Sequence, residues 1–430
     1  MGLILGYEGE DGHGGSMGFT SPRHPTSPGA LVRDVGAEGH LLCVAPTGAG
    51  KSASFAIPQL LNYPGAVIAV DVKGELYRVT ARYRRSLGPV AVIDPFRMVS
   101  DGADAFNPIA HLTANNPCLV DDAYAIAGLF ATGRSTNRAG DLDPFWSDWS
   151  MDVIAALIVH VLCREDETHR ALGRVYERFH ADDHVYDLAV LLDTELPHAF
   201  TRAKLGKYLG LPEITRGGVT ATVVQHLRML ASEGVRASLA RDTLDAALLT
   251  SGAPCTLYLV VPPDKLASHG ALLRLKLTAL LQRLMRRTHR PDHSTLLLVD
   301  EASQLGPIPA LVSAITLGRG YGIRAALLVQ SLAQLRLAYG DAATAILENC
   351  ALLTMGRHFS YAMSRDLAEQ GFGDVSADTL FGLGADQLMV RIGGYKSRAL
   401  RKLDYRHDPL LRGRFDANPL YQRAPQEPVR

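Results

Sequence analysis

The sequence has few cysteines and no excess of charge of either sign. Its 430 residues include five scattered cysteines: Cys43, Cys118, Cys163, Cys255 and Cys350. Neither a disulfide framework nor a CxxC metal site is indicated, and this pattern fits a reducing compartment. The 44 Lys and Arg residues balance the 44 Asp and Glu residues. This balance excludes the global basic field of a whole-surface nucleic-acid binder.

A signal peptide and a long apolar run are also lacking. Met1–Gly15 has neither a basic n-region nor an extended apolar core. Apolar stretches such as Val153–Cys163 fall short of the roughly 20 residues needed to cross a bilayer. We therefore expect a cytoplasmic chain without a transmembrane segment, peripheral at most to the inner face of the cell membrane. The 15 histidines show no HExxH spacing, and no structural metal is expected.

The order of apolar runs predicts an α/β fold interrupted by helices. Short apolar strands alternate with helical stretches from His40 and again from Thr256, which is typical of a mainly parallel sheet flanked by helices. The stretch between them has helical spacing and no clear strand. We expect an α/β fold with an inserted all-α domain, divided into 1–39 (loop or edge segment), 40–106 (first part of the nucleotide-binding domain), 107–251 (all-α insertion) and 252–430 (second part and tail).

A phosphate-binding loop is predicted between the first strand, Leu41–Ala45, and the helix that follows. Its residues are Ala45, Pro46, Thr47, Gly48, Ala49, Gly50, Lys51 and Ser52. They match G-x-x-x-x-G-K-[ST] except that Ala45 replaces the first glycine. Backbone amides and the helix N-terminus would hold phosphate oxygens, the lysine would lie between the β- and γ-phosphates, and the Ser52 hydroxyl would ligate Mg²⁺. Because a strand precedes the loop and a helix follows, ATP and Mg²⁺ binding is favoured over a chance match.

Two carboxylates end the apolar run Thr295–Val299. We expect Asp300 to hold Mg²⁺ and Glu301 to orient and deprotonate the water that attacks the γ-phosphate. Gln330 ends a later strand and is expected to hydrogen-bond that water or the γ-phosphate. Each of these residues alone is also consistent with a solvated strand end, and the phosphate loop favours the catalytic interpretation.

The motifs together resemble the TraG/TraD-like coupling ATPases of type IV secretion and conjugation. The phosphate loop, Asp71-Val72-Lys73-Gly74-Glu75-Leu76, Asp143-Pro144-Phe145-Trp146, Asp300-Glu301-Ala302, Gln330-Ser331, Tyr405-Arg406-His407-Asp408-Pro409 and Asn418-Pro419 carry the resemblance in this order. It implies a RecA-like domain, a homo-hexameric ring, and ATP-driven passage of DNA or protein. The implied partners are single-stranded DNA, a relaxase or protein effector as cargo, and secretion-channel components or a membrane-anchoring protein.

Family members usually begin with transmembrane helices, and none is evident before the phosphate loop. A soluble DNA translocase of the HerA/FtsK kind is therefore an alternative, as is a non-enzymatic adaptor that binds nucleotide only to fix its shape. Intact Glu301 disfavours the adaptor.

Several charged residues are weaker candidates. Ring ATPases complete the site with an arginine from a neighbouring subunit, and the candidates are Arg319, Arg324 and Arg357; each is also consistent with a surface ion pair. The accessory candidates are Asp71, Lys73 and Glu75, of which the last two also suit a plain helix start. Basic clusters at Arg78–Arg85, Arg283–Arg290 and Arg398–Arg406 are either solvated helix faces or DNA contacts in a pore.

Overall fold

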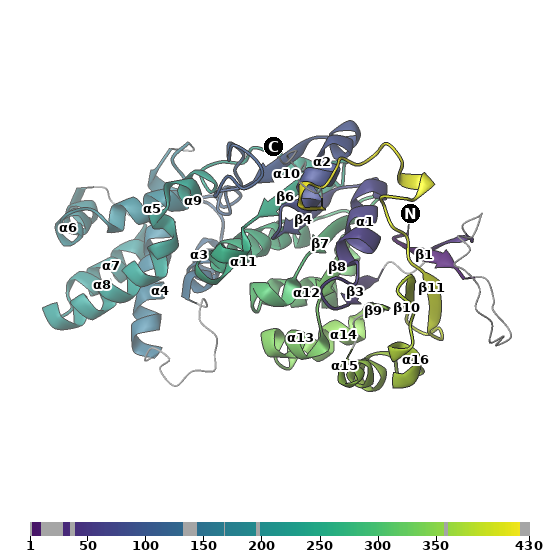
Figure 1. Cartoon of the computed structure of the whole chain (residues 1–430). Helices are drawn as coiled ribbons and strands as arrows, with labels where there is room; N and C mark the ends of the chain where they lie inside the picture. The colour runs from purple at the N-terminus through teal and green to yellow at the C-terminus, as the bar shows by residue number, and fades with distance from the viewer. Residues whose placement is uncertain are drawn as a thin grey trace, which may run out of the picture. The chain divides into compact units, whose positions relative to one another are not determined.

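A computed structural model describes residues 2–9, 29–34, 39–131, 144–166, 168–194, 198–356 and 360–421. The chain divides into two compact units (Figure 1). The first comprises Met1–Val90, Ala247–Tyr258 and Leu284–Arg430, and the second comprises Ala91–Ala246 and Leu259–Arg283.

The first unit is built on a mixed sheet. Its strands follow the order β2-β1-β11-β10-β9-β3-β8-β7-β4-β6. They are β1 (Ile4–Glu8), β2 (Leu31–Arg33), β3 (His40–Val44), β4 (Val67–Asp71), β6 (Thr256–Val260), β7 (Thr295–Val299), β8 (Ile323–Val329), β9 (Cys350–Met355), β10 (Gln387–Arg391) and β11 (Arg398–Arg401). The strand β5 (Val90–Ile93) has only its first residue, Val90, in this unit. The predicted α/β fold class is confirmed.

The centre of the sheet is parallel and buried on both faces. β3 pairs in parallel with β8 and β9, and β7 pairs in parallel with β4 and β8. Every residue of β3, β4, β7 and β8 is buried, as expected of continuous apolar runs covered by helices. Because parallel strands share one direction, the residues that follow β3, β4, β7 and β8 gather at one edge of the sheet.

Helices connect these strands. They are η1 (Ser52–Ala56), α1 (Ile57–Asn62), α2 (Glu75–Leu87), α10 (Ala246–Ser251), η3 (Ala302–Leu305), α12 (Pro309–Leu317), η4 (Gly318–Tyr321), α13 (Leu332–Tyr339), α14 (Ala342–Asn349), α15 (Tyr361–Asp366), η5 (Leu367–Phe372), α16 (Ala377–Phe381), η6 (Pro409–Leu411) and η7 (Pro419–Tyr421). η1 is a π-helix directly after the phosphate loop.

The antiparallel side of the sheet was only partly anticipated. β10 pairs antiparallel with β9 and β11, and β1 pairs antiparallel with β11 and β2. Residues 1–39 were expected to form a loop or edge segment. The described part of this range contains two strands, β1 and β2. β2 pairs with β1, and β1 joins the rest of the sheet through β11, where Tyr7 lies opposite Arg401. No local pattern reveals a pairing over so long a stretch of sequence.

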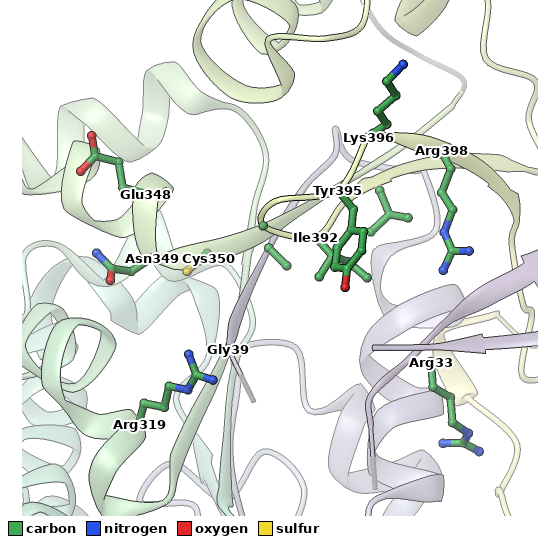
Figure 2. A pocket seen from close by; sticks show the side chains of 13 residues that line it. Arg33, Gly39, Arg319, Glu348, Asn349, Cys350, Ile392, Tyr395, Lys396 and Arg398 are labelled. Carbon is green, nitrogen blue, oxygen red and sulfur yellow. The ribbon is translucent and has the colours of Figure 1, made fainter. Parts of the chain in front are cut away.

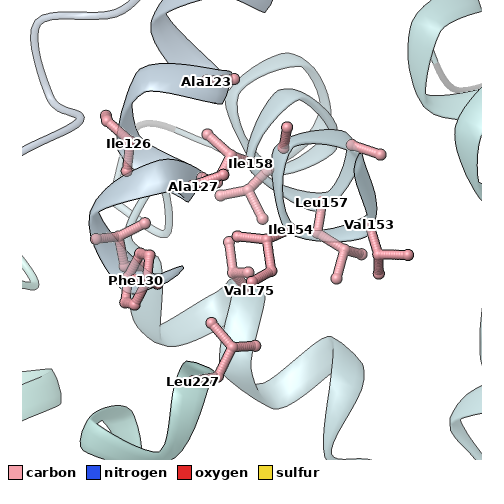
Figure 3. Packing of buried hydrophobic residues seen from close by; sticks show 14 of the residues in the cluster. Ala123, Ile126, Ala127, Phe130, Val153, Ile154, Leu157, Ile158, Val175 and Leu227 are labelled. Carbon is pink, nitrogen blue, oxygen red and sulfur yellow. The ribbon is translucent and has the colours of Figure 1, made fainter. Parts of the chain in front are cut away.

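The second unit is a helical bundle. It contains α3 (Leu119–Ala131), α4 (Pro144–Arg164), α5 (Leu172–Phe179), α6 (His184–Thr194), α7 (Ala199–Leu209), α8 (Glu213–Leu227), η2 (Arg228–Ala231), α9 (Glu233–Ala237) and most of α11 (Pro263–Met285). Apolar residues of α3, α4, α5 and α8 meet in its core (Figure 3), among them Phe130, Leu157, Val175 and Leu227.

The expected insertion limits of 107–251 differ from this unit at both ends. α11 was assigned to the nucleotide-binding domain, but its Leu272 and Leu275 belong to the core of the helical unit. Residues 91–106 also join that unit, where Phe106 N donates to Ser238 O at 3.0 Å. These differences arise because packing partners, rather than chain order, decide which unit a segment joins.

Helix α4 is long and apolar enough to cross a membrane by length and composition alone. In the structure, 61% of its most apolar window is buried, and Val153–Leu162 forms part of the bundle core. Burial of this kind is also typical of a core helix in a soluble protein, so the test is weak evidence for a span.

The helical unit contains a buried lysine. Lys276 on α11 is 1% exposed, and its Nζ donates to Ser238 O at 2.6 Å. Burial lowers the pKa of Lys276 to about 7, and the nearby Asp242 carboxylate only partly offsets this effect. The unfolded chain therefore binds more protons than the folded chain between pH 7 and about 10, and stability rises with pH across that window.

We expect Lys276→Met to stabilise the helical unit at pH 7 by roughly 2–4 kcal/mol, because it removes an amine that is protonated in the unfolded chain and costly to bury. The Ser238 carbonyl keeps its bond from Phe106 N. Thermal unfolding at pH 7 and pH 9 measures the effect, and the advantage of the variant should shrink at pH 9. An equal advantage at both values would contradict the assigned pKa.

Candidate functional site

The phosphate loop connects β3 to η1 and has the backbone that its sequence requires. Gly48 and Gly50 have φ values of 83° and 97°, a region that favours glycine. Ala45 is fully buried and does not have a positive φ, and its N–H donates to Val329 O at 3.1 Å. Alanine therefore replaces the first glycine of the motif without backbone strain.

Lys51 is buried and folded back on the loop. Its Nζ donates to Ala45 O at 2.7 Å and to Pro46 O at 3.3 Å. These two carbonyls hold the ammonium against the phosphate loop itself.

Ser52, the predicted magnesium ligand, donates its hydroxyl hydrogen to Glu75 Oε1. Glu75 is the first residue of α2 and is 2% exposed. Its other carboxylate oxygen accepts from Asn418 Nδ2 at 3.1 Å. Glu75 was predicted only as an accessory residue, and the structure gives it direct contact with the phosphate loop.

Asp300 follows β7 and is 1% exposed. Both of its carboxylate oxygens are buried and lack a hydrogen-bond partner among the described residues. Burial raises the pKa of Asp300 to about 6, although Lys73 and Lys51 lower it. Two buried carboxylate oxygens without a donor among the described residues fit Mg²⁺, which prefers oxygen ligands.

Glu301 lies at the centre of a polar chain. Its Oε2 accepts from Gln330 Nε2 at 3.1 Å, and its Oε1 lies 3.6 Å from Lys73 Nζ. Gln334 Nε2 then approaches Gln330 Oε1 at 3.5 Å. Glu301 has a left-handed backbone with φ 53°, which costs a non-glycine residue about 1 kcal/mol. Strain of this size is typical of a residue whose direction matters for function.

Two accessory candidates differ in role. Asp71 ends β4, is fully buried, and accepts from the backbone N–H groups of Lys73 and Tyr77 at 3.3 and 2.9 Å. It therefore shapes the turn before α2. Lys73 extends toward the acidic edge; burial opposes its charge, but the carboxylates of Asp300, Glu301 and Glu75 raise the pKa of Lys73 overall.

Two of the three predicted trans arginines lie within the described residues. Arg324 is 5% exposed and pairs with Asp34 of its own chain, so its guanidinium is already engaged. Arg319 precedes β8 at the amino ends of the parallel strands, opposite the phosphate loop. Arg357 lies outside the described residues.

Some of the basic clusters also have a structural role. Arg84 is buried and donates to Thr256 Oγ1 and to carbonyls including Gly65 O. Arg283 donates to Asp242 and to Asn107 O. These arginines are neither solvated helix faces nor exposed DNA contacts, because their guanidiniums satisfy carbonyls and carboxylates at the ends of elements.

Arg319 instead lines a cavity of about 800 Å³ at the amino ends of β3, β8 and β9 (Figure 2). Its lining includes Arg33, Lys396 and Arg398 from neighbouring strands and loops, with Glu348 as the one carboxylate. Figure 2 shows Arg319 and the Tyr395 ring approaching this space from different sides.

Lys402 is a site residue that the sequence indicated only as a member of the basic cluster Arg398–Arg406. Its Nζ donates to Ala49 O in the phosphate loop at 2.9 Å, to Gly356 O at 3.0 Å and to Ala385 O at 2.8 Å. No signal in the sequence indicated that it contacts the phosphate loop.

The parallel sheet, the phosphate loop and the acidic strand end define a RecA-like P-loop NTPase. The family described as "Type IV secretory system Conjugative DNA transfer" matches residues 17–361. The chain belongs to this family.

Curated relatives and solved structures agree with this assignment. The chain is similar to Protein VirD4 of Agrobacterium fabrum, with 28% identity over 89% of this chain and 61% of the relative. It is also similar to Conjugal transfer protein TraG of the same organism, with 25% identity over 70% of this chain and 45% of the relative. The chain thus spans less than two thirds of these relatives.

The bacterial conjugative coupling protein TrwBdeltaN70 has the same fold. The match has a TM-score of 0.66 at 15% identity and covers 87% of each chain. TrwB in complex with ADP and Mg²⁺ matches with a TM-score of 0.62 at 15% identity, covering 85% of each chain.

We expect Arg324→Ala to destabilise the first unit by about 3–5 kcal/mol, because it leaves the buried Asp34 carboxylate without its cation. Nucleotide affinity of the folded fraction should stay within twofold of wild type. Thermal unfolding and nucleotide titration measure the two effects. An unchanged melting temperature together with lost hydrolysis would restore Arg324 as a trans arginine.

Proposed function

We propose that this chain is the ATP-hydrolysing coupling protein of a type IV secretion or conjugation system. The observation that carries the ATPase proposal is the pairing of Glu301 with Gln330 and Lys73 beside the orphaned carboxylate of Asp300. A site that only binds nucleotide has no need for a buried, strained glutamate at this position.

The residues divide the chemistry among them. Loop amides and Lys51 bind the phosphates, and Ser52 and Asp300 would hold Mg²⁺, which when bound neutralises charge on the β- and γ-phosphates. Glu301 orients a water and accepts its proton as the water oxygen bonds to the γ-phosphorus and the bond to the ADP oxygen breaks. Gln330 fixes the direction of the Glu301 carboxylate.

The family match supports secretion over a HerA/FtsK-like role in DNA processing, because the matching family is defined by conjugative DNA transfer. Under this proposal the cargo is single-stranded DNA with its relaxase, or a protein effector. The chain acts as a homo-hexamer at the inner face of the membrane, with secretion-channel components as partners. The helical unit engages cargo.

We expect Glu301→Gln to bind ATP normally but to lower turnover 10²–10⁴-fold, because the amide cannot accept a proton. Lys51→Ala should weaken nucleotide binding at least tenfold, since it removes the ammonium from the phosphates. Phosphate release and nucleotide titration check these results, with exposed Glu213→Gln as the control. Wild-type turnover in Glu301→Gln would end the mechanism.

The cavity lined by Arg319 supports part of the DNA proposal. Arg319, Lys396 and Arg398 are exposed and have no carboxylate partner among the described residues. Tyr395 is 78% exposed beside them. Unpaired cations next to an exposed aromatic ring match the chemistry of a single strand, whose phosphates attract cations and whose bases stack.

We expect Arg398→Glu and Lys396→Glu each to weaken binding of a fluorescent oligo-dT several-fold, whereas Arg365→Glu, an exposed position on α15 outside the cavity lining, should not. Because each lost phosphate contact releases one counterion fewer, the slope of log affinity against log salt should fall by about 0.7. Fluorescence anisotropy at several salt concentrations measures it. Equal effects of all three variants would show non-specific charge attraction only.

A further inference from the structure

The C-terminal segment, residues 402–421, runs along the nucleotide site of the same chain. Tyr405 N donates to Ala53 O at 3.2 Å, and Asp416 N donates to Val79 O on α2 at 2.9 Å. Arg82 on α2 also contacts the segment: its Nε donates to Asp416 Oδ1 at 2.6 Å. The segment is therefore tied both to the helix after the phosphate loop and to α2.

The first of these ties has a cause in the sequence. In the π-helix η1, Ile57 N–H bonds Ser52 O, five residues back. The matching donor for Ala53 O would be the N–H of residue 58, but Pro58 has none. The Ala53 carbonyl is thus left without a helical partner, and Tyr405 N–H of the C-terminal segment satisfies it. Pro58 creates a docking point for the segment one residue away from Ser52.

The segment ends on the carboxylate that holds Ser52. Asn418 is 6% exposed, and its Nδ2 donates to Glu75 Oε2 at 3.1 Å. Its Oδ1 accepts from Leu420 N at 3.0 Å, which fixes the orientation of the amide. Glu75 Oε1 accepts the Ser52 hydroxyl hydrogen. One buried carboxylate thus connects the C-terminal segment to the predicted magnesium ligand.

We propose that Asn418 is a positioning residue for Mg²⁺-dependent nucleotide binding and acts on Ser52 through Glu75. A hydroxyl that gives its hydrogen to Glu75 directs its lone pairs away from that carboxylate, which is the orientation a metal ligand needs. The Asn418 amide holds Glu75 in the acceptor position, and the docked segment holds Asn418. Outer contacts of this kind commonly tune metal affinity 10–100-fold. The inference rests on the proposed nucleotide function of the site.

The test is the Mg²⁺ dependence of binding of a fluorescent ADP analogue to the full chain. Asn418→Ala should raise the Mg²⁺ concentration for half-maximal binding about tenfold, and affinity in excess chelator should not change. Asn115→Ala, which removes an exposed asparagine amide before α3, is the matched control. Asn418→Asp keeps the acceptor for Leu420 N but offers no donor to Glu75, so it should show at least the same shift even if the alanine variant folds poorly.

A double-mutant cycle separates positioning from general support of the fold. In a Glu75→Ala background, Asn418→Ala should have no further effect on the Mg²⁺ requirement, because its target is gone. An unchanged Mg²⁺ requirement in folded Asn418 variants, or an undiminished effect without Glu75, would overturn the proposal. A wild type that binds the analogue with Mg²⁺ but never hydrolyses ATP would defeat the proposed ATPase and leave this inference standing.

Discussion

The structure depends on a concentration of buried carboxylates at the carboxyl edge of the parallel sheet. Asp71, Glu75, Asp300 and Glu301 are all at most 5% exposed, and Lys51 and Lys73 are the cations beside them. Burying like charges together is costly, and desolvation raises the pKa of Asp71 to about 7. The neighbouring elements reduce this cost: backbone amides cap Asp71, Gln330 and Lys73 hold Glu301, and a serine and an asparagine hold Glu75.

One of the four carboxylates has no such support from the residues that the structure describes. Both oxygens of Asp300 lack a donor among them, while its three neighbours each have at least one. The fold provides donors to three of these buried carboxylates but not to Asp300. This difference is expected if Asp300 binds a group that is not part of the polypeptide. This contrast supports the proposed metal-binding role of Asp300 more directly than its place in a motif does, because it distinguishes residues of the same chemical type.

Local sequence patterns predicted the parts of this site that are local in structure. The strand-loop-helix around Lys51 and the strand end at Asp300 were placed within one or two residues, because an apolar run and a glycine-rich turn act over a few positions. The support of Glu75 by Asn418 joins residues 343 positions apart, and the buried pair of Arg324 with Asp34 joins residues 290 apart. Neither leaves a periodic trace in the sequence, so Arg324 was interpreted as a trans arginine or a member of a surface ion pair, and Asn418 only as part of a family signature.

The same reasoning explains why basic clusters were poor guides to nucleic-acid contact. The fork of guanidinium donors is well suited to capping several carbonyls at once, and Arg84 and Arg287 do this at the ends of strands and helices. Charge in the sequence therefore cannot distinguish a structural arginine from a binding one. Their interaction partners distinguish them: Arg398 and Lys396 lie on the exposed turn and strand after β10, and no described carboxylate pairs with either.

The sheet thus places supported acids at the carboxyl ends of its parallel strands and, among the described residues, unpaired cations near their amino ends. The five residues of β3 connect the two, at about 3.3 Å per residue. A fully buried strand joining the two keeps a fixed separation between the proposed nucleotide site and the proposed DNA-binding cavity.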